Sequence, residues 1–421
     1  MLDPDRAFPY RAGALCAEDV PLAELAARFG TPLYVLSHAA LVEAWERLSG
    51  AFGAPAPLIA YAVKANPSRA VIRTLARLGA GADVVSGGEL LRALEAGVPP
   101  ERIVFSGVGK REDELELAVE RGIFSVNVEV EGELEQLARI ARSRGREVRV
   151  SFRINPDVEA GAHEYISVGK KVNKFGLPLE DVPALYRRAA GLPGVRPHGV
   201  DCHIGSQLLQ LEPLAVALDR VAGLVRALRA DGLPVEVVDV GGGMGVRYLD
   251  ETPPAPEAWA GVVRERIDPL GVRLVLEPGR ALVANAGLLL TRVLHRKTSR
   301  GKRFLIVDAA MNDLPRPALY GARHAVLAAR ADAGTMEGDL VGPICETGDF
   351  LARDRRLPDL EAGELLAVLS AGAYCRSMAS NYNSRPRAAE VMVRGSEAHL
   401  VTAREALAEL SAGERTPPFL I

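Results

Sequence analysis

Cysteine is scarce in this 421-residue sequence, and no two cysteines form a close pair. Cys16, Cys202, Cys345 and Cys375 are far apart, without a Cys-x-x-Cys motif. This spacing argues against a disulfide framework and favours a reduced compartment. The histidines are also scattered along the chain, so we expect no metal site.

Long apolar runs and an excess of one charge are absent too. No run approaches the ~18 residues that a membrane span needs. The first residues lack the basic-then-apolar pattern of a signal peptide. The net charge is only −3, which gives no indication of a nucleic-acid or membrane-surface partner. We therefore expect a soluble cytoplasmic protein.

Lysine is rare as well, because only seven of the 51 basic residues are lysines. Lys64 closes the apolar run Leu58–Val63, which is typical of a buried strand. A buried ammonium is costly, and the pKa of lysine falls readily on burial, as Schiff-base chemistry requires. The alternative is that Lys64 only extends from the strand end into water. Lys110 is the one rival after a strand, but its charged turn predicts a solvated side chain. The seven are Lys64, Lys110, Lys170, Lys171, Lys174, Lys297 and Lys302.

Short apolar runs alternate with amphipathic helical stretches over residues 37–290. Eight β-then-α units in roughly 250 residues are typical of a (β/α)₈ barrel, with an open doubly wound sheet as the alternative. Each run closes on small, polar or charged residues, as barrel active sites require, and this favours the barrel. The predicted strands are Pro57–Lys64, Gly81–Ser86, Ile103–Ser106, Phe124–Val128, Val148–Asn155, Pro197–Ile204, Val235–Gly241 and Arg273–Glu277.

Residues 1–36 and 291–421 are predicted to form a second, β-rich domain. After residue 290 apolar runs are separated by turns, and few helical stretches occur. A short helix is predicted at Ala403–Leu410. The predicted strands are Phe304–Ala309, Leu340–Cys345, Leu365–Ala371, Ala389–Val393 and Ala398–Thr402.

Three glycines, Gly241, Gly242 and Gly243, follow the seventh predicted strand. Glycines let backbone N–H groups approach and surround a phosphate. The dinucleotide fingerprint fails because Val246 stands where it needs glycine, and no Gly-Lys-Ser/Thr follows. The alternative is a tight strand–helix turn. Phosphate sites after strands 7 and 8 are frequent in barrels, and this is the seventh strand.

The sixth and eighth predicted strands also end in polar residues. Glu277 could pair with Arg280, or it could hold a basic ring nitrogen protonated. Gly279 would offer its N–H to the same phosphate. His203 could be a core residue or could stack on a planar cofactor, with Ser206 reaching the phosphate.

Polar groups of the second domain are less specific on their own. Cys345 lies beside Glu346 in a turn and is either packing or an acid. Tyr374 ends a strand among small residues. Arg316 and Tyr320 lie in a segment with two prolines, which predicts an exposed loop that could also be ordinary surface.

One cofactor accounts for these features together. A phosphate, a basic ring nitrogen and an aldehyde that condenses with Lys64 describe pyridoxal phosphate. In their order along the chain the motifs resemble the fold-type III pyridoxal-phosphate decarboxylases, and among these the diaminopimelate decarboxylase family. The resemblance spans nearly the whole chain and rests on Tyr61–Asn66, His203–Ser206, Gly241–Gly243, Glu277–Arg280, Met311–Tyr320, Cys345–Asp349 and Gly372–Tyr374.

The resemblance implies an alanine-racemase-like barrel with a C-terminal β domain, in a homodimer whose active sites are shared. It makes Lys64 the Schiff-base residue and Cys345, from the partner subunit, the proton donor. The implied cofactor contacts are Lys64, His203, Ser206, Gly241, Gly242, Gly243, Glu277, Pro278, Gly279, Arg280 and Tyr374. The implied substrate contacts are Arg280, Arg316, Tyr320, Glu346 and Tyr374.

The expected reaction is decarboxylation of meso-2,6-diaminopimelate to L-lysine and CO₂. Racemases of the related fold place an arginine where this chain has Glu277, so Glu277 favours decarboxylation. Two arginines match a distal carboxylate, and Glu346 matches the ammonium. Ornithine and lysine decarboxylases carry Asp after the cysteine. Two rivals remain: a non-catalytic homologue, and a phosphate-binding barrel enzyme that does not use pyridoxal phosphate.

Overall fold

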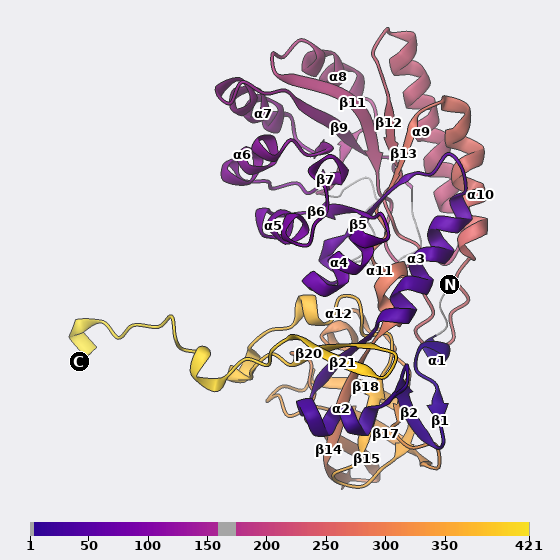
Figure 1. Cartoon of the computed structure of the whole chain (residues 1–421), viewed down its shortest axis with the longest axis vertical. Coiled ribbons are helices and arrows are strands. Elements are labelled where there is room, and N and C mark those ends of the chain that lie inside the picture. Colours follow the sequence, from indigo (N-terminus) through magenta and orange to yellow (C-terminus); the bar gives the residue numbers. More distant parts are fainter. Residues whose placement is uncertain (1–3, 159–173, 421) are drawn as a thin grey trace. The chain divides into compact units, whose positions relative to one another are not determined.

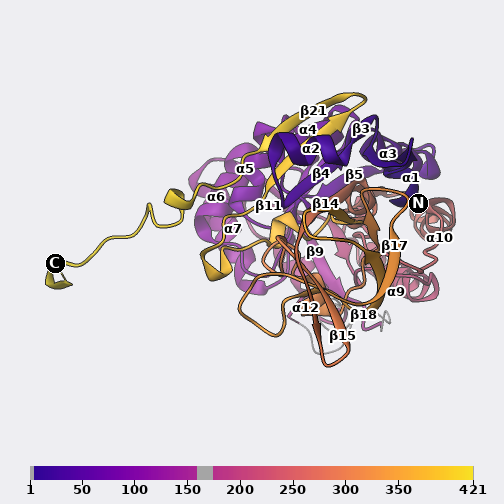
Figure 2. The same ribbon diagram turned by 90° about the horizontal axis from the view of Figure 1, so that it is seen from below.

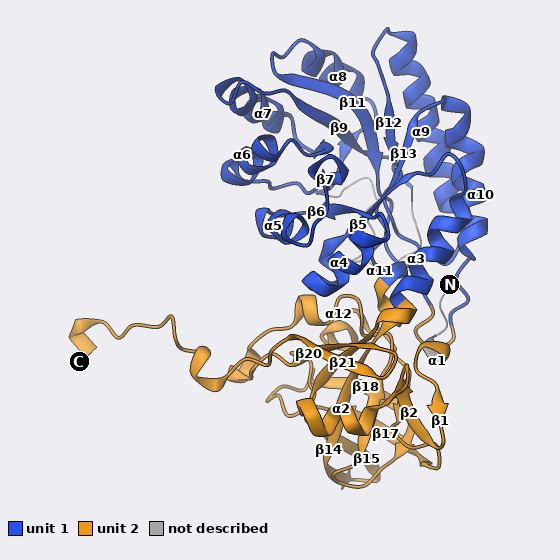
Figure 3. Ribbon diagram, in the orientation of Figure 1, with its two compact units in different colours: residues 1, 41–246, 251–282 blue, residues 2–40, 247–250, 283–421 orange. Residues whose placement is uncertain are grey.

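The computed structural model describes residues 4–158 and 174–420, which form two compact units (Figures 1 and 3). Residues 41–246 and 251–282 belong to unit 1. The flanking residues up to 40, residues 247–250 and the chain from 283 onward belong to unit 2. No helix in the described ranges is long and apolar enough to cross a membrane.

Unit 1 is a closed parallel barrel of eight strands, as the sequence predicted. Each strand pairs with the next, and the ring closes where the first strand, β5, pairs with the last, β13. An open sheet would leave these two edges unpaired, so the doubly wound alternative is wrong. The strands are β5 (Leu58–Ala62), β6 (Gly81–Val84), β7 (Ile103–Phe105), β8 (Ser125–Val128), β9 (Val148–Asn155), β11 (Val195–Cys202), β12 (Val237–Asp239) and β13 (Arg273–Leu276), and β10 (Leu177–Pro178) pairs outside the ring with β9.

The helices of unit 1 lie around the outside of the strands (Figure 1). They bury the apolar faces that the sequence shows: in α9, for example, Leu214, Leu218 and Val225 are all buried. The helix α7 ends just before Gly145, whose φ of +59° is readily adopted only by glycine. The helices are α3 (His38–Phe52), α4 (Arg69–Arg77), α5 (Gly87–Glu95), α6 (Glu112–Arg121), α7 (Glu131–Ser143), α8 (Val182–Ala190), α9 (Glu212–Ala230), α10 (Pro256–Ile267) and α11 (Arg280–Val283).

Unit 2 is built on a mixed β-sheet, which confirms the predicted β-rich character. Its order is β18-β17-β15-β14-β4-β20-β21, with β19 bridging β14 and β16. An N-terminal strand, β4, inserts between β14 and β20, so both ends of the chain build this sheet. Its elements are α1 (Pro4–Ala7), β1 (Tyr10–Arg11), β2 (Ala14–Ala17), β3 (Val20–Pro21), α2 (Leu22–Phe29), β4 (Leu33–Ser37), β14 (Gly287–Ser299), β15 (Lys302–Val307), α12 (Arg316–Tyr320), β16 (Val326–Ala328), β17 (Gly334–Val341), β18 (Phe350–Asp359), β19 (Leu365–Val368), β20 (Ala389–Arg394) and β21 (Glu397–Thr402).

Two local predictions for unit 2 are wrong. The strand predicted at Leu340–Cys345 ends at Val341, because Pro343 lacks the N–H that a ladder requires. The helix predicted at Ala403–Leu410 is only a 3₁₀ turn, Leu407–Glu409. The chain after β21 extends away from the sheets of its unit in both views (Figures 1 and 2), and Leu407 is 73% exposed. A short helix without a packed face is marginal in water.

Candidate active site

Lys64 lies just beyond the end of β5, in the 3₁₀ turn Val63–Ala65. Its Nζ is 2.6 Å from Oδ2 of Asp83 on β6, and Asp83 is fully buried. The register of the two strands, which pairs Ala62 with Asp83, brings the two charges together. Lys64 therefore has a buried counter-ion, which the sequence reasoning missed. The sequence feature that could have revealed this counter-ion is Asp83, an acidic residue inside the apolar run Gly81–Val84.

Lys110 was predicted to be solvated, and this is wrong. Its side chain is 1% exposed, and Nζ lies 2.7 Å from Oε1 of Glu133 on α7. The same ammonium donates to the carbonyl oxygens of Gly107 and Asn127, each at 2.7 Å. All three donor positions of the ammonium are thus used within the protein, so Lys110 has a structural role.

A layer of charged side chains crosses the barrel at the carboxyl end of its strands. Register places Arg153 of β9 beside Asp201 of β11, and Asp201 beside Asp239 of β12. Glu277 follows β13, two residues beyond the register partner of Asp239, and carboxylate oxygens of Asp201, Asp239 and Glu277 lie within 4.8 Å of one another. Three carboxylates this close and this well buried cannot all stay ionised unless a cation lies among them. Without a cation, at least one of them must be protonated.

The surroundings of Glu277 favour its protonated form. Burial, followed by the charges of Asp239 and Asp83, holds the pKa of Glu277 well above its ordinary value. Burial likewise raises the pKa of Asp239 to about 7. The Ser106 hydroxyl donates to Oε1 of Glu277 at 3.2 Å and fixes the carboxyl group.

The glycine loop is held between the ends of β11 and β13. The N–H of Gly242 donates to Nδ1 of His203 at 3.3 Å, and the N–H of Gly241 donates to Oδ1 of Asp239 at 2.9 Å. A Cβ on Gly242 would meet the carbonyl oxygen of Glu277 at 2.3 Å. Only glycine fits there. Desolvation, with Arg153 as the next cause, holds the pKa of His203 well below its ordinary value, so its ring is neutral.

The segment after β13 joins the glycine loop to the turn that carries Lys64. The N–H of Ala62 donates to the carbonyl oxygen of Pro278 at 3.1 Å, and a Cβ on Gly279 would meet the Cβ of Ala65 at 3.0 Å. Arg280 is buried and donates from Nη2 to the Ser206 hydroxyl at 2.9 Å. Unit 1 thus gathers every predicted residue of the sixth, seventh and eighth strand ends around one barrel mouth.

Three predicted residues of unit 2 lie in turns near strand ends. Cys345 is exposed, whereas the other three cysteines are buried, so it is not a packing residue. Its N–H donates to Oδ1 of Asn383 at 2.8 Å. Glu346 is exposed, and a hydrogen bond to its carboxylate raises the pKa of Tyr382. Tyr374 is partly exposed, with a φ of +57°.

The segment of Arg316 and Tyr320 was predicted to be an exposed loop, and this is wrong. It forms the short helix α12, in which Arg316 is only 5% exposed and Tyr320 is partly exposed. Its prolines lie at the cap and in the first turn, where proline is tolerated because those N–H groups have no helical partner.

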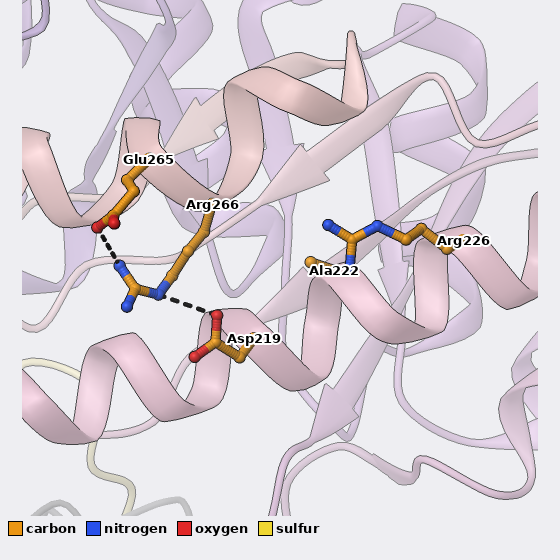
Figure 4. Close-up of a pocket in the computed structure, with 5 residues that line it drawn as sticks. All are labelled: Asp219, Ala222, Arg226, Glu265 and Arg266. Atoms are coloured by element: carbon orange, nitrogen blue, oxygen red, sulfur yellow. Dashed lines mark hydrogen bonds and ion pairs between the residues drawn. The ribbon is translucent and has the colours of Figure 1, made fainter.

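One further hollow lies on the outer surface of the barrel, between α9 and α10 (Figure 4). Arg266 there is already paired, with Asp219 at 3.1 Å and with Glu265 at 2.8 Å. The residues that line this hollow belong to the outer helices α9 and α10 and not to the carboxyl ends of the barrel strands. We assign them no part in the reaction.

The barrel mouth fits pyridoxal phosphate. Lys64 offers an amine that can condense with an aldehyde, Asp83 holds it from a buried position, and a glycine-only loop follows the seventh strand. Buried oxygens of Asp201 and Asp239 lack hydrogen-bond partners among the described residues, and a protonated ring nitrogen beside Glu277 would bring positive charge to this carboxyl cluster.

The comparisons with known proteins agree with this geometry. The family model "Pyridoxal-dependent decarboxylase, pyridoxal binding domain" matches residues 38–284. The chain is 52% identical to a diaminopimelate decarboxylase of Pseudomonas aeruginosa, over 98% of this chain and 99% of that protein. A crystal structure of the M. jannaschii diaminopimelate decarboxylase in co-complex with L-lysine is 37% identical, with a TM-score of 0.95 and complete coverage of both chains.

A third similar protein is the Helicobacter pylori diaminopimelate decarboxylase complexed with L-lysine. Its crystal structure is 41% identical, with a TM-score of 0.90, and the match covers 93% of this chain and 98% of that one. The similarity covers both units, and the family match covers the barrel. The chain therefore belongs to the pyridoxal-dependent decarboxylases and, among these, to the diaminopimelate decarboxylase family.

Proposed function

We propose that the chain decarboxylates meso-2,6-diaminopimelate to L-lysine and CO₂, the last step of lysine biosynthesis. The observation that carries this proposal is the full-length similarity to diaminopimelate decarboxylases, at 52% identity over 98% of the chain. The site in unit 1 supports it, because it offers an amine, a protonatable carboxyl group and a glycine loop at one barrel mouth.

Residues of unit 1, together with Tyr374 of unit 2, would bind the cofactor. Pyridoxal phosphate, when bound, supplies the electron sink for the Cα–CO₂⁻ bond that breaks. Lys64 would hold its aldehyde carbon, and His203 would stack on its ring. The phosphate would lie among Ser206, Gly241, Gly242, Gly243, Gly279 and Tyr374, with Pro278 and Arg280 adjoining.

Glu277 would keep a proton at the ring nitrogen. Burial, followed by the charges of Asp239 and Asp83, raises the pKa of Glu277 well above its ordinary value, which favours its protonated form. A basic nitrogen placed against it would take or share that proton, and the surrounding negative charge would stabilise the resulting cation. Asp83, whose Oδ2 lies 2.6 Å from Nζ, would hold the Lys64 side chain in place beside the cofactor. An electron-poor ring favours decarboxylation over racemisation.

Cys345 would protonate Cα after CO₂ leaves. Its exposed position leaves the thiol accessible, as a residue supplied to a partner subunit's site needs to be. A positioned general acid contributes typically ~10²–10⁴-fold. The proposal therefore includes a homodimer in which each site uses residues of both subunits.

Substrate recognition would rest on charge. Arg316 and Arg280 would bind the carboxylate that survives the reaction, because a guanidinium binds carboxylate in a bidentate way. Glu346 would bind the distal ammonium, and Tyr320 and Tyr374 would complete the pocket. We further propose that residues 37–290 act as the cofactor-binding domain and that the enzyme works in the cytoplasm.

The test is CO₂ release from meso-diaminopimelate, lysine, ornithine and arginine, measured side by side with the same preparation. We expect release from meso-diaminopimelate alone. Equal or faster release from ornithine or lysine would contradict the substrate assignment. Borohydride treatment should fix the cofactor's colour onto Lys64, and a colourless protein would favour a barrel enzyme of another kind.

A further inference from the structure

Arg316 is a buried guanidinium whose partners among the described residues are all uncharged. Its Nη1 lies 2.7 Å from Nε2 of His324, and its Cζ lies 4.3 Å from the ring centre of Tyr248. Within the described part of its unit, no carboxylate pairs with it. A buried charge without a counter-charge is costly, so the arrangement points to an anionic ligand that supplies one.

The hydrogen bonds of His324 fix its tautomer. The carbonyl oxygen of Leu369, 2.8 Å from Nδ1, can only accept, so Nδ1 carries the hydrogen. The guanidinium of Arg316 can only donate, so Nε2 must offer its lone pair. The imidazole is therefore neutral and accepts one N–H of Arg316. The other N–H groups of the guanidinium can then donate to a ligand.

The support of His324 is rigid. Its own carbonyl oxygen accepts from Arg355 at 2.6 Å. The N–H of the next residue, Ala325, donates to the carbonyl oxygen of Tyr248 at 3.1 Å, and the carbonyl oxygen of Ala325 accepts from Leu369 at 2.9 Å. His324 is fully buried, and its ring meets that of Tyr248 edge-on at 4.9 Å. These contacts hold the two rings in one orientation against the guanidinium.

We propose that His324, supported by Tyr248, is a positioning residue that orients Arg316 toward the carboxylate that the substrate keeps after decarboxylation. The inference rests on the proposed function, in which Arg316 binds that carboxylate. Bidentate recognition needs the plane of the guanidinium to be fixed, and a free arginine side chain would lose rotational entropy on binding. His324 and Tyr248 remove that cost before the substrate arrives.

The test compares two ligands that differ in this carboxylate alone. L-Lysine carries it, and cadaverine is the same chain without it. With the holoenzyme, His324→Phe should weaken L-lysine binding by about 10- to 100-fold, because it removes an acceptor from a charged donor. Cadaverine binding should change by less than about 3-fold. The KM for meso-diaminopimelate should rise with the L-lysine Kd, and the cofactor spectrum should stay unchanged.

Two variants keep the test decisive. His324→Gln restores an acceptor toward Arg316 and should recover at least part of the L-lysine affinity. His198→Phe is the matched control, because His198 is also buried but bonds to Ser125 in unit 1; it should leave the ratio of lysine to cadaverine affinity unaltered. If His324→Phe fails to fold, Tyr248→Leu takes its place, with a loss of about 3- to 10-fold in L-lysine affinity expected.

Equal changes for L-lysine and cadaverine, or no change for either, would overturn the positioning role. A different result would overturn the proposed function instead: wild-type enzyme that releases no CO₂ from meso-diaminopimelate. The two failures are distinguishable, because the first is a property of variants and the second of the wild type.

Discussion

Replacing Glu277 by glutamine should stabilise the cofactor-free protein while it disables the enzyme. Glu277 is buried, and burial with the charges of Asp239 and Asp83 raises its pKa well above the ordinary value of 4.5. An acid with a raised pKa in the folded state opposes folding as pH rises, because the unfolded chain releases the proton more easily. Below pH 4.5 the effect is absent. It grows with pH until the pKa of the folded state is passed.

The magnitude follows from the same shift. Above pH 4.5, each pH unit at which the folded protein keeps the proton that the unfolded chain has released costs up to ~1.4 kcal/mol of stability. Glutamine is neutral at every pH, so the variant escapes this cost. Its Oε1 can still accept from the Ser106 hydroxyl, which lies 3.2 Å from the present Oε1. CO₂ release by the holoenzyme should fall at least ~10²-fold, since the ring nitrogen loses its acid.

The assay is urea unfolding of the cofactor-free protein, followed by circular dichroism at pH 5, 6, 7 and 8. The difference in the free energy of unfolding between Glu277→Gln and wild type should widen with pH. Glu101→Gln is the control, because Glu101 is exposed in the 3₁₀ turn Pro100–Arg102 before β7. The reasoning would be refuted if Glu277→Gln were less stable than wild type. It would also be refuted if the difference in the free energy of unfolding were the same at all four pH values.

Three further changes probe other parts of the molecule. Cys345→Ala should slow CO₂ release by about 10²–10⁴-fold and leave the cofactor bound, as absorbance would report; unchanged turnover would remove the thiol from the reaction. Lys110→Met should cost about 3–5 kcal/mol in urea unfolding, because it leaves Glu133 buried without its partner. Burial raises the pKa of Glu133, so the loss should be larger at pH 8 than at pH 5, and a loss independent of pH would contradict this. Gly242→Ala should weaken cofactor binding at least ~10-fold in a fluorescence titration, since its Cβ would meet the Glu277 carbonyl oxygen at 2.3 Å; unaltered affinity would show that the loop can move.

Matched variants control for two of these changes. Gly132→Ala adds the same methyl group where no atom lies within 4 Å, so cofactor affinity should not respond. Cys16→Ala removes a buried thiol of unit 2 and should leave CO₂ release near that of the wild type. A comparable loss of turnover in Cys16→Ala would make the effect at Cys345 structural.

The barrel could be predicted from the sequence because the strands of a parallel barrel are buried on both faces. They appear as continuous apolar runs, each ending in polar residues where the strand reaches the barrel mouth. The unit 2 sheet was less predictable. The long strand β14 begins with apolar residues but ends in exposed polar ones, as its burial pattern shows, so no single period marks it. The 3₁₀ turn at Leu407–Glu409 had a helical pattern but no surface of its unit on which to pack.

What the sequence determined by itself was the chemistry of the site: one lysine after the first strand, three glycines after the seventh, a glutamate after the eighth. These are local features, readable in order along the chain. Only the tertiary structure decided which charges meet. The register of neighbouring strands places Asp83 against Lys64 and aligns Arg153, Asp201 and Asp239, although these residues lie far apart in sequence. Burial of Lys110 and Arg316 was decided in the same way, because the exposed fraction of a side chain depends on what packs over it and not on its neighbours in the chain.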